Sequence, residues 1–154
     1  MKKFLVSLAV ALAAVGCNSD GGGGSPTDPS QVNIEFSTTD LVVGTGAEAV
    51  AGRTATLPFE LFLYNPSGTA SKGTRIQGST DASPQSPGGV VGPVVFVIGS
   101  GTLIPGFDLG VRGMKVGGRR RMYIPPNLAY GSTGSGPIPP NASIVFEVEL
   151  TNVQ

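Results

Sequence analysis

The sequence predicts an α+β fold, in which several short antiparallel strands pack with one short helix. Short apolar runs recur from about residue 32 onward, and Gly or Pro bounds each of them. The run 143–150 alternates between apolar positions and others, as expected for an antiparallel strand with one buried face. Only the stretch 105–111 has the features of a helix, and one helix with several strands gives an α+β architecture.

The first sixteen residues have the pattern of a secretory signal peptide. Lys2 and Lys3 form a short positive region, and thirteen mainly apolar residues follow, from Phe4 to Gly16. At 1.5 Å per helical residue, this run is too short to cross roughly 30 Å of hydrocarbon. Residues 1–16 therefore predict export of the chain and their own removal.

Residues 17–31 are expected to form a lipid-modified, flexible tether. The run AVGC, which ends at Cys17, resembles a bacterial lipobox, in which the cysteine is lipidated and becomes the new N-terminus. An ordinary signal peptide with a chance cysteine is the alternative. The segment NSDGGGGSPTDPS that follows has no apolar side chain whose burial could offset the entropy of ordering it. We expect lipidated Cys17 and this coil to hold a folded domain, residues 32–154, beside a membrane.

Five apolar runs predict the strands of the domain: 41–43, 55–64, 94–98, 121–124 and 143–150. The second run contains Pro58, which has no N–H to donate to a neighbouring strand. We therefore expect an edge position or a bulge at this proline.

Charged residues occur in two of the predicted strands. Arg119, Arg120 and Arg121 would alternate between the two sides of a strand, and we expect a solvated face there. Glu147 and Glu149 share the polar side of the last run. A carboxylate pair serves catalysis in glycosidases, but solvation is the expected state of these two side chains.

Residues 105–111, with the sequence PGFDLGV, predict a helix of at most two turns. Pro105 suits the first helical position, and Asp108 would lie near the positive end of the helix dipole. Gly110 weakens the helix, so we expect it to be short.

The composition excludes several kinds of chemistry. The 154 residues include no His, which removes the usual general base and the commonest metal ligand. Cys17 is the only cysteine, so the chain forms no internal disulfide and no Cys-based metal cluster. Ten basic and ten acidic residues cancel, and no concentrated basic face predicts nucleic-acid binding. We expect no metal and no cofactor, and a reaction that breaks no covalent bond.

The stretch from Leu103 to Leu150 resembles the proline-binding half of an FKBP-type peptidyl-prolyl cis-trans isomerase. The run GMKVGGRRRMYIPPNLAYG is its most specific part, and the segments PVVFVIGSG and 137–150 extend it. Upstream, TTDLVVGTGAEAVAGRTATLPFELFLYNPSG matches in the spacing of its glycines and apolar residues. The resemblance implies an FKBP-like twisted antiparallel sheet wrapped around one short helix, with the proline pocket between them.

The resemblance also implies roles for individual residues. Phe107 would be the floor beneath the proline ring, the backbone N–H of Ile104 would donate to one substrate carbonyl, and the Tyr130 hydroxyl to another. These three are the expected catalytic residues. The other expected substrate-binding residues form the surrounding walls: Phe59, Ile76, Gln77, Val94, Leu103, Ile138 and Phe146. Core packing is the alternative role for the aromatic side chains.

The chain departs from the family pattern at several pocket positions. Relatives place Tyr where this chain has Phe59, a Phe-Asp pair where it has Ile76 and Gln77, and Phe where it has Val94. Many also have Trp in place of Phe107. The Tyr hydroxyl and the Asp carboxylate pair with each other in relatives, and losing both leaves no buried group without a partner. We therefore expect proline binding to be retained and catalysis to be slower.

The resemblance implies an enzyme that isomerises Xaa-Pro bonds in exported proteins, with proline-containing polypeptides as its partners. An apolar pocket favours the twisted amide over the planar one, so the reaction needs no protonating side chain. A proline-binding chaperone module with little turnover is the alternative, and a structural surface lipoprotein is a third possibility. We expect a monomer anchored in the bacterial envelope, on the periplasmic side of the outer membrane.

Overall fold

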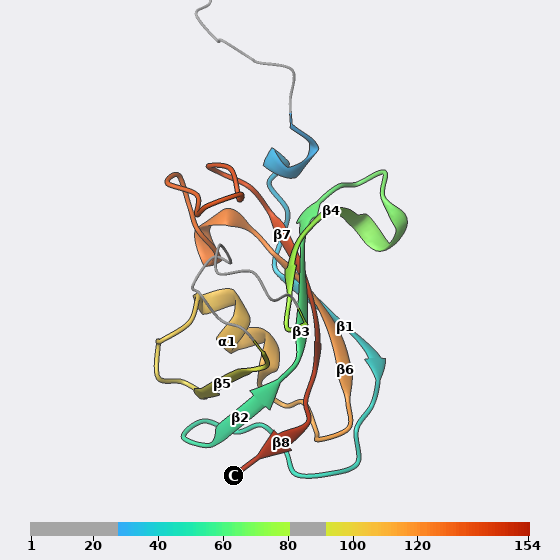
Figure 1. Ribbon diagram of the computed structural model, residues 1–154, viewed down its shortest axis with the longest axis vertical. Helices are drawn as coiled ribbons and strands as arrows, with labels where there is room; N and C mark the ends of the chain where they lie inside the picture. Colours follow the sequence, from blue (N-terminus) through green and yellow to red (C-terminus); the bar gives the residue numbers. More distant parts are fainter. Residues whose placement is uncertain (1–27, 81–91) are drawn as a thin grey trace, which may run out of the picture.

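The computed structural model describes residues 28–80 and 92–154, which form two antiparallel sheets and one α-helix (Figure 1). The predicted α+β class is confirmed. Residues 1–27, which include the expected signal peptide and Cys17, lie outside the described residues. No helix of the described part is long and apolar enough to span a membrane.

The larger sheet has five strands and the smaller sheet has three. The order in the larger sheet is β1 (Ser37–Val42), β6 (Arg119–Ile124), β7 (Ile144–Glu149), β3 (Phe59–Tyr64) and β4 (Lys72–Gly78). The order in the smaller sheet is β5 (Val94–Val97), β2 (Thr54–Leu57) and β8 (Asn152–Val153). The helix α1 spans Pro105–Val111, and three 3₁₀ turns occur at η1 (Pro29–Gln31), η2 (Thr69–Ser71) and η3 (Pro126–Leu128).

The core lies between the larger sheet and α1. In the pairing of β3 with β7, Leu61 lies opposite Phe146 and Leu63 lies opposite Ile144. The period-two pattern of β7 therefore directs its apolar side chains to the helix side, as the sequence predicts. Because β3 and β7 are flanked on both sides, the centre of the sheet is held by hydrogen bonds in both directions.

Pro58 separates two strands that belong to different sheets. The apolar run 55–64 was expected to be one strand with an edge or a bulge at this proline. Instead β2 ends at Leu57 in the smaller sheet and β3 begins at Phe59 in the larger one. The Pro58 carbonyl accepts the Glu149 N–H at 3.0 Å, so the proline keeps its one backbone hydrogen-bonding group paired.

The predicted helix 105–111 is confirmed, and it lies very close to β6. A Cβ atom added at Gly106 would overlap Ile124 Cγ2, and one added at Gly110 would overlap Met122 Sδ. Arg120 Nη1 donates to the Gly110 carbonyl at 2.9 Å. Gly110, which weakens α1 as an isolated helix, therefore allows α1 to pack closely against β6.

The outward face of the larger sheet carries ion pairs, and the expectation of a solvated face was wrong for several residues. Glu147 Oε1 lies 2.7 Å from Arg121 Nη2 and 3.1 Å from Lys72 Nζ. On the opposite, helix-facing side, Arg120 Nε donates to Asp40 Oδ1 at 2.6 Å. Burial alone would raise the pKa of Glu147, but the hydrogen bonds from Arg121 and Lys72 outweigh it, so this pKa lies below its ordinary value.

The ordered domain includes residues that we expected to belong to the tether. Residues 29–31 form η1, and Ser30 is buried. The strands β4 and β8 were not predicted, because their sequences KGTRIQG and NV lack an apolar alternation.

Candidate functional site

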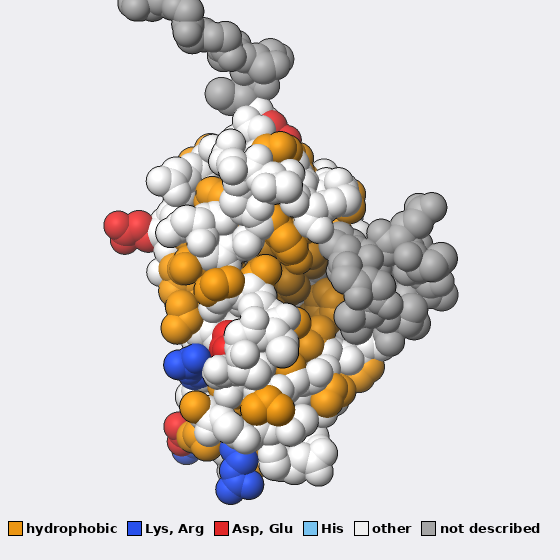
Figure 2. Space-filling model, turned by 90° about the vertical axis from the view of Figure 1, so that its left-hand side faces the viewer, with side chains coloured by type: hydrophobic (Ala, Val, Ile, Leu, Met, Phe, Trp, Pro, Cys, Tyr) orange, Lys and Arg blue, Asp and Glu red, His pale blue; other side chains and the backbone are white. Residues whose placement is uncertain are grey.

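A cavity of about 400 Å³ opens between α1 and the helix-facing side of the larger sheet. Figure 2 shows hydrophobic side chains gathered along a hollow on this side of the molecule. Eleven residues line the cavity: Phe59, Leu61, Gln77, Val94, Thr102, Leu103, Ile104, Phe107, Tyr130, Ser135 and Phe146. Tyr130 is the only ionisable side chain among them, so the described residues that line the cavity carry no charge at neutral pH.

Aromatic rings form the floor of the cavity. The Phe107 ring lies 5.0 Å from the Phe146 ring, at an interplanar angle of 82°, and 5.8 Å from the Phe96 ring. Phe59 contacts Phe146 from the other side, with 5.8 Å between the ring centroids. The two contacts of Phe107 are edge-to-face and that of Phe59 is tilted, and together they fix the orientation of the rings. Phe107 and Phe146 both line the cavity and belong to the core. A pocket position and core packing, expected as alternatives for the aromatic side chains, are therefore combined in these two residues.

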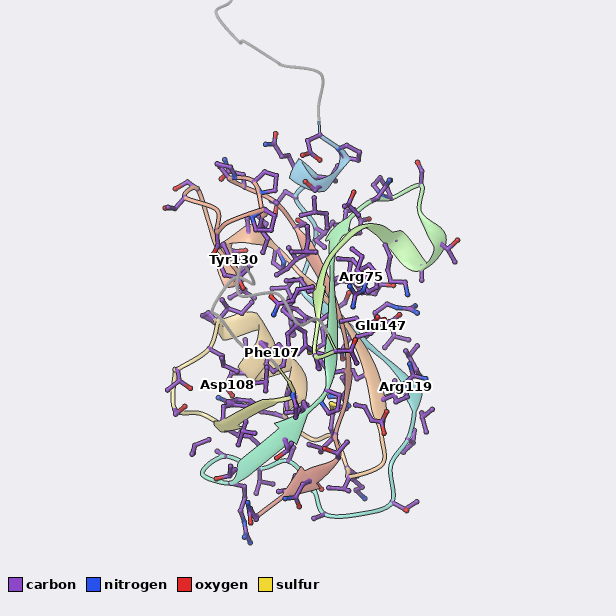
Figure 3. The ribbon with its side chains drawn as sticks, in the orientation of Figure 1. Arg75, Phe107, Asp108, Arg119, Tyr130 and Glu147 are labelled. Carbon is purple, nitrogen blue, oxygen red and sulfur yellow. The ribbon has the colours of Figure 1, made fainter. Side chains whose placement is uncertain are left out.

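One wall of the cavity is the loop that joins β5 to α1. Thr102, Leu103 and Ile104 belong to this loop, and Asp108 holds Gly99 near its beginning. Both oxygens of the buried Asp108 carboxylate accept the Gly99 N–H, at 3.0 and 2.9 Å. Figure 3 shows Asp108 beside Phe107 on the same helix. Asp108, the residue after Phe107, therefore anchors the loop between β5 and α1 that forms this wall.

Two hydrogen-bond donors at the cavity have no acceptor within residues 28–80 and 92–154. One is the Tyr130 hydroxyl, and the other is the Ile104 N–H, which precedes the first turn of α1. Burial raises the pKa of the Tyr130 hydroxyl. The hydroxyl therefore stays protonated, and able to donate, throughout the physiological pH range. Within the described residues, nothing occupies these donors, so both can bind carbonyl oxygens of a ligand.

The structure brings together eight of the ten residues that we expected in the pocket. Ile76 and Ile138 do not line the cavity; Ile138 is buried in the core, and Ile76 packs against the core from outside it. Leu61, Thr102 and Ser135 line the cavity and were not expected. Leu61 could have been found from its period-two spacing to Phe59, and Thr102 from its place beside Leu103. No pattern in the Gly-rich stretch around Ser135 distinguishes it.

A larger hollow of about 710 Å³ lies on the other side of the segment that carries Tyr130. Residues 31–36 form one side of it and residues 125–128 another. We assign the site to the smaller cavity, because the aromatic floor and the two free donors meet there. In the described part of the chain, no group of three or more acidic or Cys side chains could hold a metal ion.

Comparisons with known proteins agree with this geometry. A sequence profile of the family described as FKBP-type peptidyl-prolyl cis-trans isomerase matches residues 46–151. The FK506-binding protein of Neisseria meningitidis serogroup A is 38% identical over 115 residues, which are 74% of this chain and 92% of that protein. The 46 kDa FK506-binding nuclear protein of Spodoptera frugiperda is 40% identical over 128 residues, or 82% of this chain. The match spans only 27% of the insect protein's length.

Solved structures show the same fold. The crystal structure of AtFKBP13 matches with a TM-score of 0.61 and 30% identity, over 77% of this chain and 93% of that one. Sheets of five and three strands with one short helix are therefore an FKBP-like arrangement, as the sequence predicted.

Proposed function

The chain belongs to the FKBP-type peptidyl-prolyl cis-trans isomerase family, and we propose that its cavity isomerises Xaa-Pro bonds by withdrawing water from the amide. The single observation that carries the mechanism is the uncharged aromatic cavity with two free donors at its edge. Isomerisation of an Xaa-Pro bond is slow because twisting the amide breaks its resonance. Water stabilises the planar amide, which is the more polar form. An apolar cavity removes this stabilisation and so lowers the barrier.

The floor and the donors have separate tasks in this mechanism. The proline ring would rest on Phe107, whose ring is fixed by its contacts with Phe96 and Phe146. The Ile104 N–H and the Tyr130 hydroxyl would hold the carbonyls on either side of the twisting bond. Because these donors favour the twisted geometry over the planar one, their hydrogen bonds accelerate the reaction instead of merely tightening binding.

The Phe59 side of the cavity supports a second candidate, a proline-binding chaperone module with little turnover. Phe59, Gln77 and Val94 line this side. The resemblance described above implies Tyr, Asp and Phe at these three positions in relatives. These substitutions remove a hydroxyl, a carboxylate and one aromatic wall, but they leave the floor intact. Proline binding depends on the floor and is therefore common to both candidates.

We further propose that the domain acts on exported proteins at a membrane surface, as a monomer. The run from Lys2 to Cys17 supports export and membrane anchoring, since it resembles a bacterial signal peptide with a lipidation site. Mass analysis of Cys17 in the membrane fraction tests the anchor, with a mass increase from acyl chains as the expected result. Migration of the unmodified chain with the soluble fraction would refute it.

Peptides that contain Leu-Pro or Phe-Pro test the isomerase proposal. We expect the purified protein to accelerate their isomerisation, and we expect Tyr130→Phe to lower kcat/KM roughly 2- to 12-fold, since one hydrogen bond contributes about 0.5–1.5 kcal/mol. Tyr64→Phe is the matched control, because it removes the same hydroxyl outside the cavity, and it should leave kcat/KM unchanged. Peptide binding by a folded protein without acceleration would refute the enzyme and support the chaperone module.

A further inference from the structure

Residues 28–32, here called the strap, are fixed to the domain by their own hydrogen bonds. Ser30 is 1% exposed, and Asp28 Oδ1 accepts its N–H at 2.9 Å and its hydroxyl at 2.7 Å. The Gln31 N–H donates to the Asp28 carbonyl at 2.9 Å and closes the turn. The strap lies outside residues 46–151, the part that matches the family profile. Its contacts are therefore made by residues that the profile does not match.

The strap binds one end of the segment 129–143, here called the Tyr130 loop. The Ser143 N–H donates to the Ser30 carbonyl at 2.7 Å, and the Ser143 hydroxyl donates to the Val32 carbonyl at 2.7 Å. Gln31 Nε2 donates to the Pro140 carbonyl at 3.2 Å. Ser143 is completely buried, so both of its donors depend on the strap for an acceptor.

The same end of the loop holds the residue next to Tyr130. The Asn141 N–H donates to the Gly131 carbonyl at 2.8 Å, and Asn141 has a left-handed backbone with φ of 57°. The Gly134 N–H donates to the Tyr130 carbonyl at 3.2 Å. Contacts therefore lead from the strap through Pro140 and Ser143 to Asn141, and from there to Gly131 and Tyr130.

The Tyr130 loop buries few side chains of its own. Ile138, Ala142 and Ser143 are buried, and the other residues of the loop are exposed or half-buried. Segments with so few buried contacts open locally at low free energy. A hydroxyl that must bind a carbonyl in a twisted amide needs a fixed position, because small displacements of a catalytic group are costly.

We infer that the strap is a positioning element for Tyr130, which holds the Tyr130 loop from behind so that the hydroxyl stays at the cavity. The part of this inference that concerns catalysis rests on the proposed isomerase function. None of the strap's hydrogen bonds given above is made to a residue that lines the cavity. It reaches the loop through the Pro140 carbonyl and through the backbone N–H and hydroxyl of Ser143.

Hydrogen exchange followed by mass spectrometry tests the structural part in the full-length protein. The variant Asp28→Ala with Gln31→Ala removes the side-chain hydrogen bonds to Ser30 and Pro140. The matched control is Asn33→Ala with Glu35→Ala, which removes an amide and a carboxylate from exposed positions just beyond the strap. We expect faster exchange in peptides from 129–143 in the strap variant, with α1 unchanged and the control like the wild type. Unchanged exchange in the loop, or an equal increase in α1, would overturn the inference.

A double-mutant cycle with Tyr130→Phe tests the catalytic part, with kcat/KM measured where every variant is folded. We expect the strap variant to lower kcat/KM when Tyr130 is present, by no more than the 2- to 12-fold expected for Tyr130→Phe itself. In the Tyr130→Phe background it should have no further effect. An equal loss in both backgrounds would show a general structural role and contradict the inference. The exchange measurement needs no turnover, so an inactive wild-type protein would refute the proposed function and still decide whether the strap holds the loop.

Discussion

Asp108 joins the wall of the cavity to the helix that carries its floor, and its removal should cost both stability and activity. Its carboxylate accepts the Gly99 N–H through both oxygens and the Arg112 Nε at 3.2 Å. The Asp108 side chain is 8% exposed, whereas that of Arg112 is 46% exposed. Asp108→Ala therefore leaves the Gly99 N–H without its buried acceptor, while Arg112→Ala only removes the more exposed partner of the Arg112–Asp108 ion pair.

The exposure of the two partners sets the expected magnitudes. A hydrogen bond to a charged, buried group contributes about 1.5–3 kcal/mol, and we expect this loss of stability for Asp108→Ala. An ion pair with a half-exposed arginine contributes about 0.2–1 kcal/mol, so Arg112→Ala should cost less than about 1 kcal/mol. For a domain of this size, 1 kcal/mol corresponds to a Tm change of about 3–5 °C.

Thermal unfolding followed by circular dichroism gives the comparison, and kcat/KM is measured at a temperature where all variants are folded. We expect Asp108→Ala to lose activity, because the loop that carries Leu103 and Ile104 is released from α1. Arg112→Ala should stay close to the wild type. Equal Tm losses in the two variants, or a loss below about 0.5 kcal/mol for Asp108→Ala, would refute this account of the wall.

Three further predictions concern the cavity, the outer sheet face and the helix. Phe59→Tyr combined with Gln77→Asp should raise kcat/KM, because the two positions are diagonal neighbours on β3 and β4 and their side chains face the cavity; an unchanged rate would show that this wall does not limit catalysis. The pKa of Glu147 lies below its ordinary value, so the stability that its ion pairs contribute is present above about pH 4.5 and is lost as the pH falls through the lowered pKa. Urea unfolding at pH 7 and pH 4 should therefore show a smaller acid-induced loss for Glu147→Gln than for the wild type, and equal losses would contradict the linkage. Gly110→Ala should destabilise the fold by about 1–2 kcal/mol despite its better helix propensity, because the new Cβ would overlap Met122 Sδ; a higher Tm would show that α1 has room to move away from β6.

The parts of the fold that were predicted are those whose signals are local. The helix 105–111 begins with a proline at its first position, and β7 alternates in period two, so neither requires knowledge of a distant residue. The strand β4 carries no such pattern. It is a strand because it pairs with the preceding strand β3, and nothing in its own seven residues indicates this pairing. At Pro58 the sequence pattern is equally consistent with a bulge within one strand and with two strands in different sheets, so the change of sheet could not be predicted.

The residues of the site can likewise be divided into those that the local sequence predicts and those that depend on three-dimensional packing. Ile104, Phe107 and Tyr130 lie in the most characteristic stretch of the chain, and the structure places all three around one cavity. Ile138 is an apolar residue in the Tyr130 loop, and only three-dimensional packing decides that it faces the core. Glu147 belongs to a polar strand face, but its partner Lys72 comes from another strand. The burial and the lowered pKa of Glu147 could therefore not be predicted from the sequence.

The close packing of α1 on β6 has a consequence for how the protein acquires its activity. A helix of seven residues with two glycines, such as α1, is too short to persist in water without partners. Its shape is supplied by Met122 and Ile124 on β6, and β6 is itself held between β1 and β7. The platform that we propose for the proline ring therefore forms only after strands from both ends of the described chain have assembled. Partly folded chains lack the platform altogether, so the appearance of proline binding during refolding should coincide with completion of the five-stranded sheet.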